Sequence, residues 1–227
     1  MDSAPARHNV ADSAFFSSLR EEASFFLVRH GRSEGNAKRI FQGLLDLPLD
    51  DSGRRQTRDA GAWLAGQGVA RVLSSPLARA IQTATIIAEA CSCRAEPNDL
   101  LKEIDTGIFT GLGFEDCEAR YPEAFAEFEW RSWDAVPGAE GSGALYARAL
   151  DAWAMLRDLQ PQIGGKIAIV THAGFLQWMI RATFGSRSWM PLFATANCGV
   201  FELSVEPTSA GPAYMQWRRL NFVAPSV

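Results

Sequence analysis

Short apolar runs alternate with amphipathic stretches along most of this chain. Six runs have the length and residue types of strands: Phe25–Arg29, Ala70–Leu73, Arg94–Ala95, Lys166–Thr171, Cys198–Val205 and Ala213–Leu220. Helical patterns separate most of them: Asp51 or Ser52 to Gln67, Ser75-Pro76 to Ala90, pieces within Phe114–Trp133 broken at Pro122, Gly143–Leu159 and Phe175–Phe184. The last two strands are close enough to form a hairpin. The alternation predicts an α/β protein, a three-layer α/β/α sandwich with a mostly parallel sheet.

The spacing of these elements also predicts how the chain is organised. Residues 1–23 are rich in Ala, Ser and charged residues, and they are expected to form a flexible arm with one helical turn near Phe15 to Glu22. Residues 24–227 are expected to form a single catalytic domain. Within it, a small helical cap is expected to be inserted at about residues 105–141, where Trp130 and Trp133 would pack the cap; lining of a substrate pocket is the less favoured reading of these two residues.

Composition narrows the class of protein. The 227 residues are 47% hydrophobic and carry a net charge of −4, which suits a folded domain and argues against nucleic-acid binding. The apolar runs are too short to span a membrane, and the N-terminus lacks the pattern of a signal peptide. The four cysteines form no disulfide framework, so a reducing, cytoplasmic location is expected.

Two of the predicted strands end in a histidine followed closely by glycine. Phe25–Arg29 continues into His30-Gly31, and Lys166–Thr171 continues into His172-Ala173-Gly174. Open α/β sheets place reactive groups at the carboxyl ends of their strands. The third histidine of the chain, His8, lies in the predicted arm and is expected to be inert. Packing alone does not explain two histidines in this context.

Two further positions complete a set of groups suited to phosphate. Arg79 lies one turn into a predicted helix that follows a strand, and Glu103 lies in a predicted loop. A guanidinium group matches phosphate oxygens, and a helix N-terminus adds free N–H groups. A neutral imidazole can attack phosphorus, while a carboxylic acid can protonate the departing alkoxide. With Arg29 supplying a second cation, these residues could transfer a phosphoryl group without a metal ion.

The motifs that carry these residues resemble those of the histidine phosphatase superfamily, also called the phosphoglycerate mutase-like family. Arg29-His30-Gly31 is similar to the family's signature at the end of its first strand. Ser75 to Ala84 is similar to Ser-Pro-Leu-x-Arg-Ala-x-Gln-Thr-Ala at every defined position, and His172-Ala173-Gly174 is similar to the late His-x-Gly. The resemblance extends over about residues 25–205.

The resemblance implies a role for each matched residue. His30 would be the nucleophile that becomes phosphorylated, and Glu103 the general acid and then the base that activates water. Arg29, Arg79 and His172 would hold the transferring phosphoryl group. Further substrate contacts are expected from Asn36, Ser33, Gln42 and the backbone N–H of Ala173, although Ser33 could equally be a capping residue. No cofactor and no metal ion is implied, and the substrate would be a small-molecule phosphate ester; the sequence does not indicate an oligomeric state.

Three functions remain open from the sequence. Metal-independent hydrolysis of a phosphomonoester is favoured, because the segment after Glu103 is modest and the C-terminal end is short and apolar. A phosphoglycerate mutase would use the same residues, and in this family it is associated with a longer insertion and a closing tail. A non-catalytic phosphate-binding protein is the third. Departures from the family pattern at Arg32 and in Gly138–Ser142 concern substrate choice more than the chemistry.

Overall fold

A six-stranded sheet forms the centre of the computed structural model, which describes residues 9–209 and 211–226. The strand order is β3-β2-β4-β1-β5-β6. The strands are β1 (Ala23–Arg29), β2 (Val69–Ser74), β3 (Ala95–Pro97), β4 (Lys166–Thr171), β5 (Val200–Pro207) and β6 (Ala213–Phe222). β1 to β4 pair in parallel, whereas β5 is antiparallel to both β1 and β6. The expected mostly parallel sheet with a late hairpin is confirmed.

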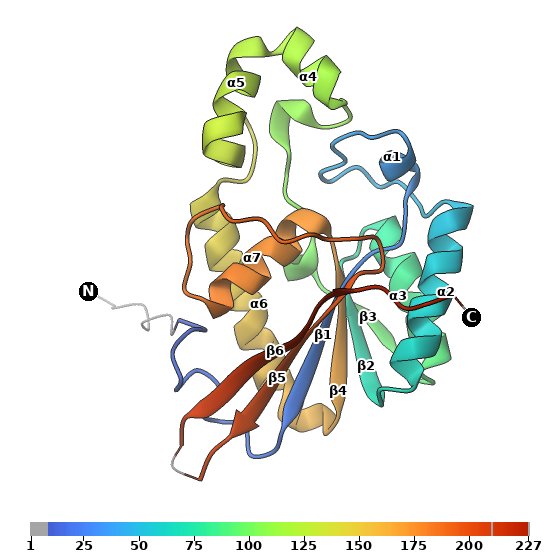
Figure 1. Ribbon diagram of the computed structural model, residues 1–227, viewed down its shortest axis with the longest axis vertical. Helices are drawn as coiled ribbons and strands as arrows, with labels where there is room; N and C mark the ends of the chain where they lie inside the picture. The colour runs from blue at the N-terminus through green and yellow to red at the C-terminus, as the bar shows by residue number, and fades with distance from the viewer. Residues whose placement is uncertain (1–8, 210, 227) are drawn as a thin grey trace.

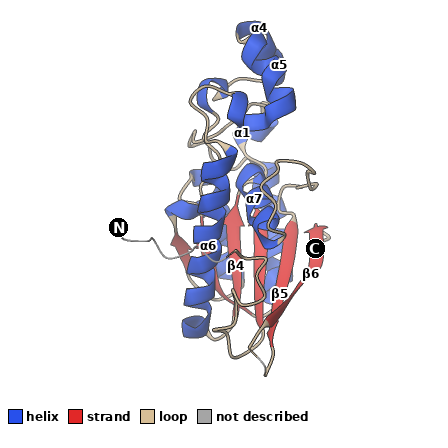
Figure 2. Ribbon diagram, turned by 90° about the vertical axis from the view of Figure 1, so that its left-hand side faces the viewer, coloured by secondary structure: helices blue, strands red, loops and turns tan. Residues whose placement is uncertain are grey.

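Helices cover both faces of this sheet. They are α2 (Asp51–Ala65), α3 (Ala78–Ala90), α6 (Ser142–Ile163) and α7 (Ala173–Thr183). Phe25 and Leu27 of β1 lie in one core with side chains of α6 and α7. Phe26 and Val28 lie in a second core with side chains of α2 and α3. Successive side chains of a strand point to opposite faces, so this continuous apolar run is buried on both sides and gives the expected three layers (Figures 1 and 2).

A cap rises beyond the sheet at the end where the parallel strands finish (Figure 1). It consists of α4 (Phe114–Arg120), α5 (Pro122–Arg131) and the short 3₁₀ turns η2 (Gly107–Phe109) and η3 (Ser132–Ala135). Its base is closed where Glu140 N–H donates to Asp105 O at 2.9 Å and Thr106 bridges Ala139. Phe109, Cys117 and Val136 form its own small core. The cap therefore has packing of its own and is joined to the domain through two chain segments that pair at Thr106 and Ala139.

The segment before β1 differs from the loose arm expected from the sequence. Residues 1–8, including His8, lie outside the described residues, but from residue 9 onward the segment packs against the domain. Phe15, Phe16 and Leu19 are buried in the core shared with α6. The Phe16 ring lies 6.1 Å from that of Trp153, edge to face. Burying these aromatic rings stabilises the packed segment more than the polar residues around them favour a solvated one. The segment therefore belongs to the folded domain.

Two helices begin at residues other than those predicted. α3 begins at Ala78 instead of Ser75, because the residue before it, Leu77, has an extended backbone and forms the N-cap. α7 begins at Ala173 instead of Phe175. Its first turn is capped by the carboxylate of Glu103, which is distant in sequence. A cap supplied from so far away leaves no local sequence signal.

The longest helix also extends beyond its prediction. α6 continues to Ile163, past Pro161, and ends at Gly164 in the left-handed conformation with φ of 65°. A proline in the last turn removes one hydrogen bond but does not end the helix. The helix ends at the glycine, which adopts the left-handed conformation at little cost. Neither α6 nor any other helix in the described part of the chain is both long enough and apolar enough to cross a lipid bilayer.

Candidate active site

The two histidines of the strand ends lie side by side. β1 and β4 are parallel neighbours, with Arg29 opposite Thr171, so His30 and His172 leave the sheet together. The backbone N–H of His30 donates to Thr171 O at 2.9 Å. The centroids of the two imidazole rings are 5.0 Å apart. The two strand ends therefore converge, as the sequence predicts, and the two imidazole rings are neighbours.

The hydrogen bonding of His30 determines which ring nitrogen is free. Its Nδ1 lies 2.7 Å from Gly31 O, and since a carbonyl oxygen only accepts, Nδ1 carries the proton. Nε2 therefore holds the lone pair. Burial lowers the pKa of His30 well below 6.5, and the positive charges of Arg79 and Arg29 lower it further. His30 is thus a neutral imidazole with Nε2 available as a nucleophile.

His172 has the opposite tautomer. The Nε–H of Arg79 donates to His172 Nδ1 at 3.1 Å, so the proton of His172 is on Nε2. That N–H is buried, and no acceptor for it exists among the described residues. Burial, followed by the charge of Arg79, lowers the pKa of His172 well below 6.5. His172 is consequently a neutral, fixed donor beside His30.

Two arginines bring positive charge to the same place. Arg29 ends β1, and its buried Nε also finds no acceptor among the described residues, while Nη1 donates to Thr195 O. Arg79, in the first turn of α3, donates from its two Nη atoms to Gly43 O at 2.9 Å and Leu45 O at 2.6 Å. Burial lowers the pKa of both guanidinium groups, and the Glu103 carboxylate opposes that effect. Guanidinium groups remain charged at neutral pH, so both are available to an anion.

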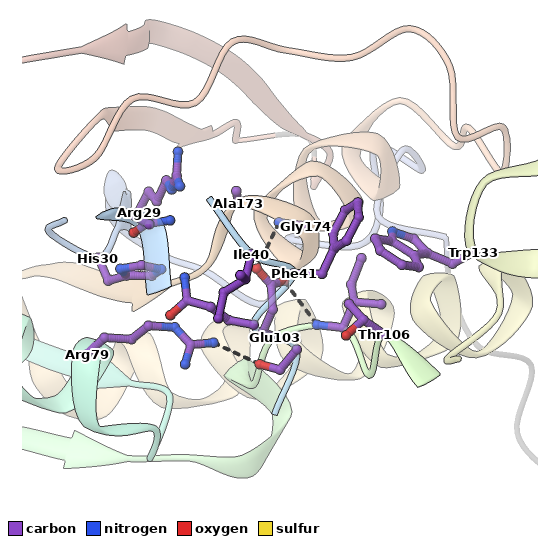
Figure 3. Close-up of a pocket in the computed structure, with 14 residues that line it drawn as sticks. Arg29, His30, Ile40, Phe41, Arg79, Glu103, Thr106, Trp133, Ala173 and Gly174 are labelled. Carbon is purple, nitrogen blue, oxygen red and sulfur yellow. Dashed lines mark hydrogen bonds between the residues drawn. The ribbon is translucent and has the colours of Figure 1, made fainter. Parts of the chain in front are cut away.

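Glu103 lies at the positive end of α7. Its carboxylate accepts from Phe175 N–H at 3.0 Å and from Gly174 N–H at 3.3 Å. Figure 3 shows the second of these contacts. A side chain at Gly174 would displace Glu103 and Ile104, because its Cβ would lie 2.7 Å from Glu103 Oε1 and 2.6 Å from Ile104 Cδ1. The remaining first-turn N–H, that of Ala173, lies at the cavity wall. The glycine of His172-Ala173-Gly174 thus allows the carboxylate to approach the helix end.

Arg148 of α6 holds the loop that carries Glu103. Its guanidinium donates to Lys102 O at 2.7 Å and lies 3.8 Å above the ring of Phe175. Glu140 forms a two-point ion pair with it, at 2.8 and 2.6 Å. Glu140 belongs to the segment Gly138–Ser142, where the sequence departs from the family pattern. This segment therefore contributes to the position of the carboxylate.

The turn after β1 orients Asn36. Ser33 is the N-cap of α1 (Glu34–Ala37), and its hydroxyl donates to Gln42 Oε1 at 2.8 Å. Asn36 Oδ1 accepts from the backbone N–H of Ser33 and from Asn197 Nδ2. With the amide oxygen engaged in this way, its Nδ2 is the group that can donate to a substrate. Ser33 is fully buried and does not line the cavity, so the structure gives it the capping role.

These groups surround one cavity of about 230 Å³. Seven of the residues expected from the sequence line it: Arg29, His30, Asn36, Gln42, Arg79, Glu103 and Ala173 (Figure 3). His172 is fully buried beside His30 and is not one of the lining residues. Sequence reasoning missed Ile40, Phe41, Gly43, Ile104, Thr106 and Gly174, and it favoured a packing role for Trp133, which also lines the cavity. Two consecutive apolar residues, Ile40-Phe41, stand in an otherwise polar, glycine-rich loop. This pattern could have indicated that the loop contributes an apolar wall to the cavity.

The buried imidazoles predict a dependence of stability on pH. Below pH 6.5, unfolded histidines bind protons that the folded protein excludes, because the folded pKa values of His30 and His172 are lowered. Stability is therefore full above that pH and falls as the pH decreases, by up to about 1.4 kcal/mol per pH unit for each histidine. Denaturant unfolding between about pH 7 and pH 5 measures this slope. His172→Gln should have a shallower slope; a slope equal to that of the unsubstituted protein would contradict the assignment.

The structure is an α/β protein in which two histidines, two arginines and a glutamate meet at one end of the sheet. The chain belongs to the histidine phosphatase superfamily (branch 1), whose sequence profile matches residues 25–218. Phosphoglycerate mutase-like protein 4 of Arabidopsis thaliana is 32% identical over 198 residues, which cover 86% of this chain and 85% of that protein. A probable phosphoglycerate mutase of Salmonella paratyphi B is 32% identical over 191 residues, which cover 80% of this chain and 84% of that protein.

Solved structures show the same fold. A mycobacterial glucosyl-3-phosphoglycerate phosphatase in complex with VO3 superposes with a TM-score of 0.75 at 24% identity, covering 87% of this chain and 98% of that one. A putative alpha-ribazole-5'-P phosphatase from Escherichia coli also gives 0.75, at 23% identity, covering 90% and 98%. The relatives thus include proteins named as mutases and proteins named as phosphatases. Membership of the superfamily does not distinguish between these two reactions. The geometry of the site has to provide that distinction.

Proposed function

We propose that this protein hydrolyses phosphomonoesters through a phosphohistidine formed on His30. The observation that carries the proposal is a pair of buried donors, Arg29 Nε and His172 Nε2, that have no acceptor within residues 9–209 and 211–226 and lie close to a neutral imidazole. A buried N–H without a partner is costly and rare in folded proteins. A phosphate group next to His30 Nε2 would satisfy both donors and meet the positive charge of Arg79.

The first step forms the phosphoenzyme. The lone pair of His30 Nε2 attacks phosphorus, and the bond from phosphorus to the ester oxygen breaks. Arg29, Arg79 and the Nε2–H of His172 stabilise the charge on the phosphoryl oxygens. Glu103, in its protonated form, gives its proton to the departing oxygen, so that an alcohol leaves in place of an alkoxide. The hydrogen bond to Gly31 O stabilises the positive charge that develops on the imidazole.

The second step releases phosphate. The Glu103 carboxylate now takes a proton from water, whose oxygen attacks the phosphorus of the phosphohistidine. The bond between phosphorus and Nε2 breaks, and inorganic phosphate leaves with the imidazole neutral and Glu103 protonated again. One carboxyl group serves both steps, because it gives a proton to the departing alcohol in the first and takes a proton from water in the second.

A phosphoglycerate mutase is the second candidate, and the names of the two curated relatives favour it. A mutase must hold its phosphoenzyme away from water while the intermediate turns round in the site. The cap here contains two short helices, α4 and α5. A cap of this size supplies little cover for the cavity and supports hydrolysis over transfer.

The test is a phosphomonoester panel with inorganic phosphate as the readout, run beside a mutase assay with 3-phosphoglycerate and its bisphosphate primer. We expect phosphate release from several esters, at rates unchanged by EDTA because the arginines supply the positive charge. Fast interconversion of phosphoglycerates with little free phosphate would establish the mutase instead. Binding of vanadate with no turnover of any ester would leave the third function, a non-catalytic phosphate-binding protein.

A further inference from the structure

We infer that the outer half of the cavity accepts an apolar, preferably aromatic, alcohol portion of the ester and discriminates against one that carries a carboxylate. This inference rests on the proposed function, because it concerns the leaving group of the same reaction. The outer chamber is defined here by Ile40, Phe41, Ile104 and Trp133. An ester bound with its phosphate at His30 would extend into this chamber.

The chamber lies on the far side of Glu103 from the phosphate-binding groups. Figure 3 shows His30 and Arg79 at one end of the cavity and Phe41 and Trp133 at the other, with Glu103 between them. A general acid must lie next to the oxygen that joins phosphorus to the leaving group. The leaving group is therefore the part of the substrate that meets the apolar walls.

The aromatic walls are held rigidly by the cap. The ring of Phe41 lies 5.3 Å from that of Trp133, edge to face at 87°. Phe41 also packs against Phe114 at 4.8 Å and Phe128 at 5.9 Å, and Trp133 lies 4.8 Å from Phe128. Because these rings are fixed before substrate binds, an aromatic leaving group gains contact area without ordering the walls.

Charge in the cavity disfavours a carboxylate in this chamber. Among the lining residues of the described chain, the cations are Arg29 and Arg79, and both belong to the phosphate end. Glu103, at the entrance to the chamber, supplies no positive charge in either of its protonation states. The hydroxyl of Thr106, the polar side chain nearby, already hydrogen-bonds to Thr110 Oγ1 at 2.8 Å. A carboxylate there would lose water without gaining a cation.

The volume of the cavity suits such an ester. A phosphate group with one ring or a short branched chain fits within its 230 Å³. The chamber therefore accommodates a monoester with an apolar group next to the ester oxygen.

The test compares esters whose leaving groups are all simple alcohols, so that bond-breaking differs little between them. They are 2-phenylethyl phosphate, glycerol 3-phosphate and 3-phosphoglycerate, assayed by release of inorganic phosphate. We expect kcat/KM for the phenylethyl ester to exceed that for 3-phosphoglycerate by about 100-fold, because the carboxylate stays unpaired in the chamber. Glycerol 3-phosphate should fall between them. Equal rates, or a preference for 3-phosphoglycerate, would overturn the inference.

Variants separate the chamber from general effects on the cap. Phe41→Leu should lower the preference for the phenylethyl ester by about ten-fold. Ile40→Lys places a cation in the chamber and should raise kcat/KM for 3-phosphoglycerate. Phe128→Leu is the matched control, because Phe128 contacts Phe41 and Trp133 but does not line the cavity. Its preference should be unchanged; an equal loss in Phe128→Leu and Phe41→Leu would assign the effect to the cap and reject the chamber.

The outcomes distinguish this inference from the function on which it rests. Phosphate release that favours the hydrophilic esters would reject the chamber and leave hydrolysis intact. No phosphate release from any ester would reject both. Release that follows the expected order, together with the gain in Ile40→Lys, would support both.

Discussion

Replacing His30 by alanine is expected to lower kcat/KM for every phosphomonoester by at least about 10⁴-fold, because no other group can form the covalent intermediate. The neighbouring imidazole cannot replace it, since Arg79 donates to His172 Nδ1 and the proton of His172 is on Nε2. Release of inorganic phosphate measures the effect. Residual activity within ten-fold of the unsubstituted protein would show that another residue is the nucleophile.

A control is needed because His30 is buried and hydrogen-bonded to Gly31 O. The alanine variant retains Arg29, Arg79 and His172, so it should still bind the phosphate analogue vanadate. A rise in melting temperature on adding vanadate reports this binding. A variant that melts normally and responds to vanadate but does not turn over has lost the chemistry and kept the fold.

The second large effect concerns Glu103. Glu103→Gln keeps an oxygen for the N-terminus of α7 but cannot give a proton, so hydrolysis of alkyl esters should fall by about 10²- to 10⁴-fold. Formation of the phosphoenzyme from p-nitrophenyl phosphate should fall much less, because nitrophenolate leaves without protonation. Stopped-flow absorbance should then show a burst of nitrophenol followed by slow turnover, since the variant also lacks the base for the second step.

Asp105 is the matched control for this substitution. It lies two residues from Glu103, where its carboxylate accepts from Gly107 N–H at 2.9 Å at the base of the cap. Asp105→Asn should leave the ratio between alkyl and nitrophenyl esters unchanged. If Asp105→Asn selectively lost the alkyl esters and Glu103→Gln did not, the general acid would be Asp105.

The core of the site was predictable because it depends on short-range sequence and on one rule of topology. Arg29-His30 and Thr171-His172 each follow a continuous apolar run, and such runs become parallel strands whose carboxyl ends meet at one edge. In the structure Arg29 pairs with Thr171 on the neighbouring parallel strand, so the two histidines that follow them lie at the same edge. The position of Arg79 at a helix start after β2 was predictable for the same reason.

Other features depend on contacts between residues distant in sequence. The role of Glu103 as the cap of α7, and the contact of Asn197 with Asn36, join segments that no local pattern relates. Burial of Phe15 and Phe16 likewise depends on the surface that α6 presents to them. The sequence could suggest which residue types suit phosphate, but not the apolar chamber, because Phe41 and Trp133 meet only when the cap folds over the turn.

The most direct measurement of the central claim is the mass of the intact protein, taken on the millisecond timescale after mixing with p-nitrophenyl phosphate. The account predicts an increase by one phosphoryl group that is labile in acid, maps to the peptide containing His30, accumulates in Glu103→Gln and is absent from His30→Ala. A phosphoryl group on a different residue, or full turnover by His30→Ala with no phosphorylated species, would contradict it.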